Sequence, residues 1–355
     1  MKINEARIGY APRSPGLDVP GDRRRFCFYA RARKLSFEVT GEPLPDQDIV
    51  VVTTTADISQ WSRADPRIKI VYDLIDSYLA LPQFTPKSLG RGVAKRLSGE
   101  TKQLIWDYRS AIEAMCARAD AVVCCTEEQR QAILRHCPNV HVILDYHGAE
   151  ARLRKRRFDA SVPFRLVWEG LPYTLPGFRE VRAALYRVRR RHAVEVHLVT
   201  DLEFRQYAGR FRKWTTRDFA ARYVDGFRLH EWTSDRVAEV VTSCDLAIIP
   251  VLLDDPMFRG KPENKLLLFW RMAMPTVTSA TPAYQRAMSQ AGLDMTCGDA
   301  ASWEELLEHY IVDADAREKA AERGYRWVTE AHSEFHLIEQ WDALFASVGF
   351  ETNKR

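Results

Sequence analysis

Positively charged side chains and a carboxylate crowd one short segment in the second half of the chain, where they could bind a phosphate. The segment covers residues 259–265. It follows a continuous apolar run that stops at Pro250, which is typical of a buried strand, and it leads into an apolar, helix-like run. The unpaired amides and the dipole at a helix start favour an anion such as a diphosphate. A solvated charged loop with an ordinary helix cap accounts for the same pattern equally well.

The residue types within this segment have complementary roles in such a site. Arg259, Lys261 and Lys265 supply positive charge for phosphate oxygens. Glu263 offers a carboxylate that can accept hydrogen bonds from the hydroxyls of a ribose or another sugar, and Asn264 is an amide beside it. We therefore predict that these residues bind a phosphorylated ligand.

Two aspartates are the candidate catalytic residues of the first half. Asp73 and Asp76 lie at the end of an apolar run over residues 68–73, which predicts a buried strand. Open parallel sheets bind ligands outside the carboxyl ends of their strands, so either carboxylate is placed to act as a base or as a hydrogen-bond acceptor. Capping of a helix by Asp73 or Asp76 is an equally good interpretation.

A glycine, an arginine and a histidine are the remaining candidate site residues, and they are expected to contact either an anionic acceptor or the phosphate. Gly21 and Arg24 belong to a glycine- and arginine-containing run at an expected helix start. His147 ends the first half and is expected at the hinge between the halves. A solvated helix face explains Arg24, and an ordinary surface histidine explains His147, without any ligand.

Apolar runs alternate with helical patterns in both halves of the chain. In the first half, strands are predicted over residues 6–11, 48–53, 68–73, 121–125 and 140–144. The same rhythm restarts at residue 165, after a polar and charged stretch over 148–163 that predicts a domain boundary. Strands separated by helices form βαβ units with a parallel sheet. We therefore expect domains at 1–150 and 151–330, and a terminal helix within 331–355.

Composition and motifs exclude several classes of protein. Of the 355 residues, 52 are Lys or Arg and 48 are Asp or Glu, and the net charge of +4 is too small for a dedicated nucleic-acid binder. The seven cysteines are scattered without zinc spacing, which favours reduced thiols in a cytoplasmic protein. The chain lacks G-x-x-x-x-G-K-(S/T) and G-x-G-x-x-G, which argues against a P-loop NTPase and a dehydrogenase.

Membrane attachment and metal binding have little support in the sequence. No run of about 18 apolar residues occurs, so no membrane span is expected. The basic run over 152–157 is open to two interpretations, a charged linker or a peripheral contact with anionic lipid at the inner membrane face. No clear metal motif is present, and no bound metal is expected.

The stretch ENKLLLFWRMAMPTVTSATPAYQRAM, with the later GDAASWEELL, resembles the donor-binding half of GT-B glycosyltransferases of the group 1 type. Three other segments resemble the family in the expected order: GLDVPGDRRRF, ARADAVVCCTEEQRQAI and LVWEG. In the family, the glycine of the last segment lets the backbone approach the diphosphate, and the resemblance gives that role to Gly170. Two positions depart from the family. Trp270 stands where a glutamate would contact the donor ribose, and Met274 stands where a glycine is usual.

The resemblance implies an α/β GT-B fold, with two Rossmann-like domains facing each other across a cleft and a terminal helix that crosses back to the first domain. It implies an enzyme that moves a sugar from a nucleotide-sugar donor to a glycan or lipid-linked acceptor in surface polysaccharide assembly, with no metal or other cofactor and no nucleic acid. Most group 1 members retain the anomeric configuration, which favours retention here. Two alternatives remain open: a sugar-nucleotide epimerase or hydrolase on the same fold, and a catalytically silent binding subunit, which the two departures favour.

Overall fold

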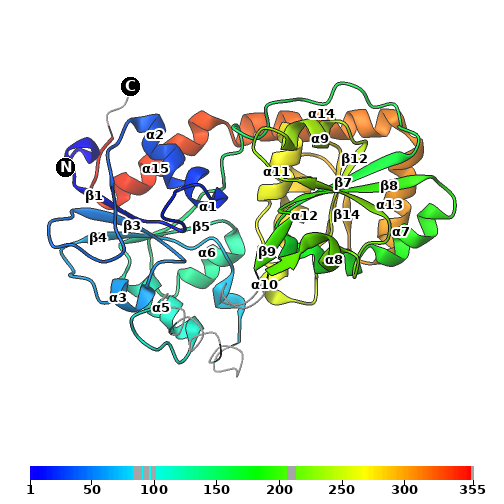
Figure 1. Cartoon of the computed structure of the whole chain (residues 1–355). Helices are drawn as coiled ribbons and strands as arrows, with labels where there is room; N and C mark the ends of the chain where they lie inside the picture. The colour runs from blue at the N-terminus through cyan, green and yellow to red at the C-terminus, as the bar shows by residue number, and fades with distance from the viewer. Residues whose placement is uncertain (83–89, 91–95, 97–100, 206–212, 353–355) are drawn as a thin grey trace. The chain divides into compact units, whose positions relative to one another are not determined.

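The computed structural model describes residues 1–82, 90, 96, 101–205 and 213–352. The chain forms two compact units (Figure 1). Unit 1 comprises Met1–Tyr146 and Glu334–Arg355, and unit 2 comprises His147–Ser333. The division lies at Tyr146 rather than at residue 150, and the chain returns to unit 1 at Glu334 rather than at residue 331.

Unit 1 is built on a parallel six-stranded sheet with the strand order β2-β1-β3-β4-β5-β6. The apolar runs form its central strands, because a parallel sheet covered on both faces buries every side chain of such a strand. The order reverses between β1 and β3, so the crevice at their carboxyl ends is the switch point of this sheet. The strands are β1 (Ile8–Ala11), β2 (Glu38–Val39), β3 (Ile49–Thr53), β4 (Lys69–Asp73), β5 (Ala121–Cys124) and β6 (Val140–Val142).

The last helix of the chain belongs to the core of unit 1. Trp341 and Phe345 of this helix are buried and stack on Tyr29, while Arg33 forms an ion pair with Asp342. The helices of unit 1 are α1 (Pro20–Arg23), α2 (Phe26–Arg33), α3 (Ile58–Trp61), α5 (Tyr108–Arg118), α6 (Glu127–Ile133) and α15 (Glu334–Ser347), with short 3-10 turns η1 (Ile3–Glu5) and η2 (Tyr78–Ala80).

Unit 2 repeats the architecture with the strand order β11-β8-β7-β12-β13-β14, again all parallel. Its order reverses between β7 and β12, which makes their carboxyl ends the switch point. A small antiparallel hairpin of β9 and β10 follows β8. The strands are β7 (Phe164–Glu169), β8 (Val194–Thr200), β9 (Glu203–Arg205), β10 (Lys213–Thr215), β11 (Phe227–Glu231), β12 (Leu246–Ile249), β13 (Thr276–Ser279) and β14 (Thr296–Cys297).

Helices cover the sheet of unit 2 between successive strands (Figure 1). They are η3 (Pro172–Arg179), α7 (Arg182–Arg189), α8 (Thr216–Ala220), α9 (Val237–Thr242), α10 (Pro256–Arg259), α11 (Asn264–Arg271), α12 (Pro282–Gln290), α13 (Ala300–Val312) and α14 (Ala314–Ala331). The polar stretch over 205–222, which the sequence pattern does not assign, contains β10 and α8 within the part that is described.

Two helices of unit 1 differ from the sequence-based expectation for identifiable reasons. Residues 23–34 have a helical periodicity that predicts one helix, but α1 ends at Arg23 and α2 begins at Phe26, because Arg25 leaves the helical conformation (φ −119°, ψ −114°) and turns its side chain into the core. The helical pattern over about 102–118 predicts a helix from residue 102, but α5 begins only at Tyr108, where the Asp107 side chain accepts a hydrogen bond from the Ser110 amide and caps the helix.

The basic run over 152–157 is attached to unit 2. Arg152 pairs with Asp235, and the Arg154 guanidinium lies 3.9 Å from the Tyr325 ring centroid. Lys155 is buried and donates to the Cys244 carbonyl oxygen at 2.6 Å. These three side chains therefore bind the segment to the rest of unit 2, which agrees with the interpretation of the run as a charged linker. Among the described helices, none combines the length and the apolar character that a membrane crossing requires.

All seven cysteines are buried free thiols. Burial raises the pKa of Cys27, Cys124 and Cys244 to about 12, so these thiols stay protonated and unreactive at neutral pH. Within the described parts of the chain, no group of three or more His, Cys, Asp or Glu side chains is arranged to hold a metal ion.

The turn after α11 has a strained residue that predicts a stabilising substitution. Ala273 is buried and has a φ of +52°, a left-handed conformation that costs a non-glycine residue roughly 1–2 kcal/mol. Ala273→Gly is expected to raise the free energy of unfolding by about 0.5–1 kcal/mol, because the greater entropy of the unfolded glycine chain offsets part of the relief. Ala287→Gly, inside α12, is the matched control and should lower it by about 1 kcal/mol. Urea denaturation measures the free energy of unfolding of both variants, and an equal loss of stability in the two would show that the backbone of Ala273 is not strained.

Candidate functional site

The start of α11 brings the Lys265 ammonium to the end of β7. Lys265 Nζ lies 5.0 Å from the Trp168 ring centroid and 3.4 Å from the Thr174 hydroxyl oxygen. A Cβ atom added to Gly170 would stand 2.1 Å from Nζ. Gly170 is therefore required because the lysine passes directly over its backbone. The two sequence-predicted residues Gly170 and Lys265 meet at the carboxyl end of β7, on the switch point of the sheet.

The surroundings of Lys265 destabilise the charged form of its ammonium group. The pKa of its ammonium is lowered to about 8, mainly by burial; the Glu169 carboxylate acts in the opposite direction, and the nearby Lys261 contributes to the lowering. An anion placed beside the ammonium would supply the charge partner that the apolar Trp168 face does not. The geometry thus suits a lysine that binds a negatively charged group.

The other predicted basic residues occupy different positions around this point. Lys261 Nζ lies 5.5 Å from the Tyr173 ring centroid and 5.2 Å from that of Phe258. Tyr173 follows Gly170 closely in sequence, so Lys261 and Lys265 approach the same loop. Arg259 is exposed at the end of the short helix α10.

Glu263 and Asn264 begin α11. The Glu263 carbonyl oxygen accepts from the Leu267 amide at 3.0 Å, and Asn264 is the first helical residue. The Glu263 side chain is buried at 7% exposure. Burial raises the pKa of Tyr284, and the carboxylates of Glu263 and Glu169 raise it further.

Glu169 and Tyr284 are therefore neighbours of the site that the sequence analysis missed. The sequence signal that could have identified Glu169 is its position directly before Gly170. Tyr284 lies in the first turn of α12, one βα unit further along the chain, and no sequence pattern relates it to Gly170.

Trp270 cannot contact a donor from the place of the family's ribose-binding glutamate. Its side chain is completely buried. It packs on Gly324 of α14, where an added Cβ would stand 2.6 Å from the indole, and it lies edge-on to Trp327. The indole thus fills the packing between α11 and α14. A ribose contact has to come from another residue.

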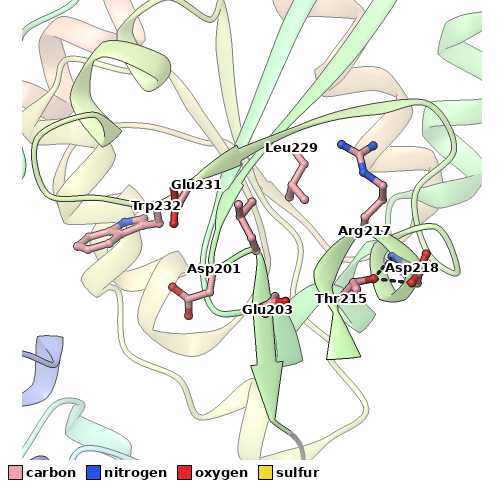
Figure 2. A pocket seen from close by; sticks show the side chains of 9 residues that line it. Asp201, Glu203, Thr215, Arg217, Asp218, Leu229, Glu231 and Trp232 are labelled. Carbon is pink, nitrogen blue, oxygen red and sulfur yellow. Dashed lines mark hydrogen bonds between the residues drawn. The ribbon is translucent and has the colours of Figure 1, made fainter. Parts of the chain in front are cut away.

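A wide pocket of about 790 Å³ opens at the carboxyl ends of β8 and β11 (Figure 2). None of the predicted donor residues lines it. Four carboxylates surround it, and burial raises the pKa of one of them, Asp201. So many carboxylates repel a phosphate, and this pocket is not suited to a diphosphate. Its lining consists of Asp201, Leu202, Glu203, Thr215, Arg217, Asp218, Leu229, Glu231 and Trp232.

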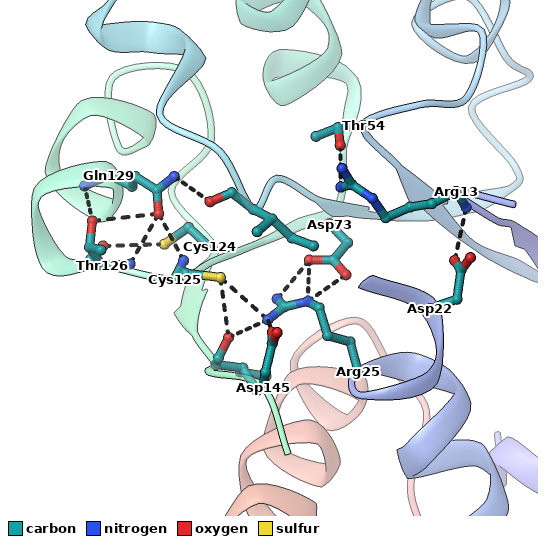
Figure 3. A network of polar contacts seen from close by, with 12 residues as sticks. Arg13, Asp22, Arg25, Thr54, Asp73, Cys124, Cys125, Thr126, Gln129 and Asp145 are labelled. Carbon is teal, nitrogen blue, oxygen red and sulfur yellow. Dashed lines mark hydrogen bonds and ion pairs between the residues drawn. The ribbon is translucent and has the colours of Figure 1, made fainter. Parts of the chain in front are cut away.

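In unit 1, Asp73 is part of a buried ion pair (Figure 3). Arg25 Nη2 donates to Asp73 Oδ1 at 2.7 Å, and Arg25 Nε donates to Oδ2 at 2.8 Å. The same guanidinium donates to Asp145 at 3.1 Å and to the Ile143 carbonyl at 2.8 Å. Arg25 and Asp73 are both 0% exposed. A hydroxyl group from a substrate has no access to this carboxylate, so the geometry does not support Asp73 as a base, whereas Asp76 is partly exposed.

The remaining residues predicted for the acceptor or phosphate side are Gly21, Arg24 and His147, and each of them contacts other residues of unit 1 or unit 2. At Gly21, the space of a Cβ is taken by the Arg13 side chain, 2.2 Å away at Cδ. The Arg24 carbonyl oxygen accepts from the Tyr146 amide at 3.0 Å. His147 is buried at 1% exposure rather than lying on the surface, and its carbonyl oxygen accepts from the Ala151 amide at 2.9 Å.

No family model matches the sequence. No curated protein matches it either. Solved structures do match in three dimensions. Anabaena HepE, in complex with UDP and glucose, has a TM-score of 0.65 at 13% identity, covering 96% of this chain and 100% of HepE. Sucrose-phosphate synthase from Thermosynechococcus elongatus has a TM-score of 0.55 at 12% identity, covering 85% of this chain and 74% of that enzyme.

The glycosyltransferase TarM is similar over a smaller share of its length. Its TM-score is 0.57 at 10% identity, covering 84% of this chain but only 54% of TarM, so the chain spans about half of that protein. At such identities the similarity concerns the fold. Together with the two six-stranded parallel sheets, these similarities show that the chain has the GT-B fold of glycosyltransferases, with two Rossmann-like domains.

Proposed function

We propose that this protein is a glycosyltransferase that binds a nucleoside-diphosphate sugar through unit 2 and transfers the sugar to a hydroxyl group bound by unit 1. One observation carries the proposal: the Lys265 ammonium is held over the backbone of Gly170, at the switch point and beside the first turn of α11. Open α/β sheets bind nucleotides at this point, and a helix start beside a cation suits a diphosphate.

The proposed chemistry follows from the charges at the site. Breaking the bond between the sugar and the diphosphate places negative charge on the leaving group, and positive groups fixed in advance stabilise that charge. Lys265, Lys261 and the dipole at the start of α11 would supply it, with no metal required by the proposal. Glu263 would accept hydrogen bonds from hydroxyls of the ribose or the sugar. Asp76 is the proposed acceptor-side carboxylate of unit 1.

Similar proteins support a uridine nucleotide as the donor. HepE is solved with UDP and glucose, and TarM is solved with UDP and a GlcNAc-glycerol. For the present chain we propose a UDP-sugar, a glycan or lipid-linked glycan as the acceptor, and a role in surface polysaccharide assembly. Retention of the anomeric configuration is the proposed outcome.

Calorimetric titration of UDP, GDP and ADP tests the donor site. UDP is expected to bind, and Lys265→Met should weaken binding about 10- to 100-fold, because a charge-assisted hydrogen bond contributes roughly 1.5–3 kcal/mol. The exposed Lys319→Met in α14 is the matched control and should bind as the wild type does. Equal affinity of the Lys265→Met variant would contradict the site.

Turnover then separates a transferase from the two alternatives. UDP-glucose and UDP-N-acetylglucosamine are incubated with and without a panel of glycans, and sugar release and transfer are measured. Transfer that exceeds release supports the proposal. Epimerised donor, or release that no acceptor changes, would indicate the epimerase or hydrolase, and binding without any turnover would indicate a silent subunit.

The pKa of Lys265 predicts the pH dependence of UDP binding. In the free protein this pKa is about 8, and a bound diphosphate should raise it. The ammonium is mostly charged at pH 7 and half charged at pH 8, so the affinity should fall by less than about twofold between these two values. Above pH 8 binding must take up a proton, and the affinity should fall towards about tenfold per pH unit.

Calorimetry in buffers of different ionisation enthalpy measures that proton uptake directly. Lys265→Arg is the control, because arginine stays charged throughout this range and should remove both the uptake and the slope. A wild-type affinity that rises with pH would contradict the assignment.

A further inference from the structure

The switch point of unit 1 holds an arginine to which the sequence analysis assigned no role. Arg13 follows β1, Thr54 follows β3 and Asp76 follows β4, so the three residues come from the carboxyl ends of three adjacent strands. The reversal of strand order lies between β1 and β3, and ligands of open α/β sheets bind outside such a reversal.

The loop that carries Arg13 is fixed from within. The completely buried Asp22 carboxylate accepts hydrogen bonds from the Tyr10 hydroxyl at 2.5 Å, from the Arg13 amide at 2.8 Å and from the Ser14 amide at 3.0 Å. Figure 3 shows Asp22 below the backbone of Arg13. Two backbone amides of the loop are thus bound to one carboxylate, which is itself bound to Tyr10 of β1, and these bonds fix the backbone at Arg13.

The side chain of Arg13 is held as firmly as its backbone. Its Nη1 donates to the Thr54 hydroxyl at 2.8 Å (Figure 3). Its Cδ lies where a Cβ of residue 21 would be, at 2.2 Å, so only a glycine at position 21 leaves room for it. A guanidinium placed in advance at a switch point loses little conformational entropy when it binds a ligand.

The charge at this place favours hydroxyl groups over phosphate. Asp76 Oδ2 lies 4.0 Å from Arg13 Nη2, and the two side chains are 28% and 22% exposed. One positive and one negative charge side by side leave the subsite close to neutral. Guanidinium N–H groups donate and carboxylate oxygens only accept, so the pair can bind two neighbouring hydroxyls of one sugar, one as acceptor and one as donor.

We propose that Arg13, fixed by Thr54 and Gly21, is a specificity-determining residue that binds hydroxyl groups of an uncharged sugar together with Asp76. This inference deepens the proposed function, since it names the acceptor class of the transferase. Arg13 positions the acceptor, and Asp76 receives the hydrogen bond of its hydroxyl.

Saturation-transfer difference NMR on the full chain tests the subsite, both with and without UDP. The probes are the methyl glycosides of glucose, galactose, mannose and N-acetylglucosamine, with glycerol 1-phosphate as the anionic probe. At least one methyl glycoside is expected to bind the wild type. Arg13→Gln should weaken that binding at least tenfold, and Arg13→Lys should restore only part of it, because lysine keeps the charge but loses the planar fork.

A glycine substitution tests the same point with Arg13 still present. Gly21→Ala should displace the guanidinium and weaken glycoside binding as Arg13→Gln does. Gly16→Ala in the same loop is the matched control, because its Cβ would meet only Asp18 at an ordinary 3.4 Å. The Gly16→Ala variant should bind the glycoside as the wild type does.

Three results would overturn the inference: no methyl glycoside binds the wild type, Arg13→Gln binds as tightly as the wild type, or glycerol 1-phosphate binds in preference to every glycoside. UDP titration of the same variants keeps this outcome separate from the proposed function. Loss of glycoside binding with unchanged UDP affinity supports the subsite, whereas absence of UDP binding in the wild type contradicts the donor site and leaves the glycoside measurement valid.

Discussion

Gly170→Ala is expected to weaken UDP binding about 10- to 100-fold while leaving the stability of the protein almost unchanged. The added Cβ would stand 2.1 Å from Lys265 Nζ, so the ammonium must leave its place. Nζ is the far end of a flexible side chain, and the other close side chain, Trp168 with its Cζ2 at 3.0 Å, would need to shift by only a few tenths of an ångström, so we expect the cost to the fold to be small. The loss of affinity then arises from the displaced charge, without removal of any charged residue.

Gly177→Ala is the matched control, from the 3-10 helix that follows Gly170. Its Cβ would stand 2.3 Å from the carbonyl oxygen of Pro250, which is backbone and cannot rotate away. This variant should therefore lose stability, by roughly 1–3 kcal/mol. Thermal unfolding and UDP calorimetry on both variants give the comparison.

The two glycines should separate the effects on stability and on binding. If Gly170→Ala binds UDP as the wild type does, Lys265 does not hold the diphosphate. If Gly170→Ala unfolds as easily as Gly177→Ala, the lysine is a packing residue, and the reduced affinity would reflect a damaged fold.

The architecture could be predicted because buried parallel strands have a simple sequence pattern. Ile49–Thr53, Ala121–Cys124 and Leu246–Ile249 are apolar along their length, since both faces of each sheet are covered. The sequence pattern points to the proposed phosphate site in part, because Lys265 and the helix that carries it are contiguous in sequence. Gly170 entered only through the resemblance to a family, since a strand that ends in glycine is common.

Contacts between distant residues could not be predicted. In the sequence, Arg25 follows Arg23 and Arg24 at an expected helix start, where a solvated helix face is the simple interpretation. Its partners Asp73 and Asp145 come from the ends of other strands, so the sequence pattern does not reveal the buried ion pair. The contacts of Arg13 with Thr54 and Gly21 form only when β1 pairs with β3, which brings these distant residues together. Sequence spacing predicts which residues share a helix or a strand, and side-chain pairing across a sheet edge depends on the tertiary fold.

The buried ion pair between Arg25 and Asp73 predicts that Asp73 stabilises the folded protein. Asp73→Asn would leave the buried guanidinium of Arg25 without its principal counter-charge, and removing one partner of a buried ion pair costs roughly 3–5 kcal/mol. UDP affinity should not change when measured under conditions where the protein is folded, because the proposed donor residues all belong to unit 2. Urea denaturation, with hydrogen exchange in the peptides of β4 and β5, locates the loss in unit 1.

A second variant separates a structural from a catalytic role for this carboxylate. Arg25→Met combined with Asp73→Leu and Asp145→Leu removes all three charges that meet at this point, and apolar replacement of a buried ionic triad is often close to neutral, so the triple variant should regain much of the stability lost in Asp73→Asn. It should also transfer sugar, since the proposed acceptor residues Arg13, Thr54 and Asp76 remain. A catalytic Asp73 would show the reverse: Asp73→Asn as stable as the wild type, with transfer abolished in both variants.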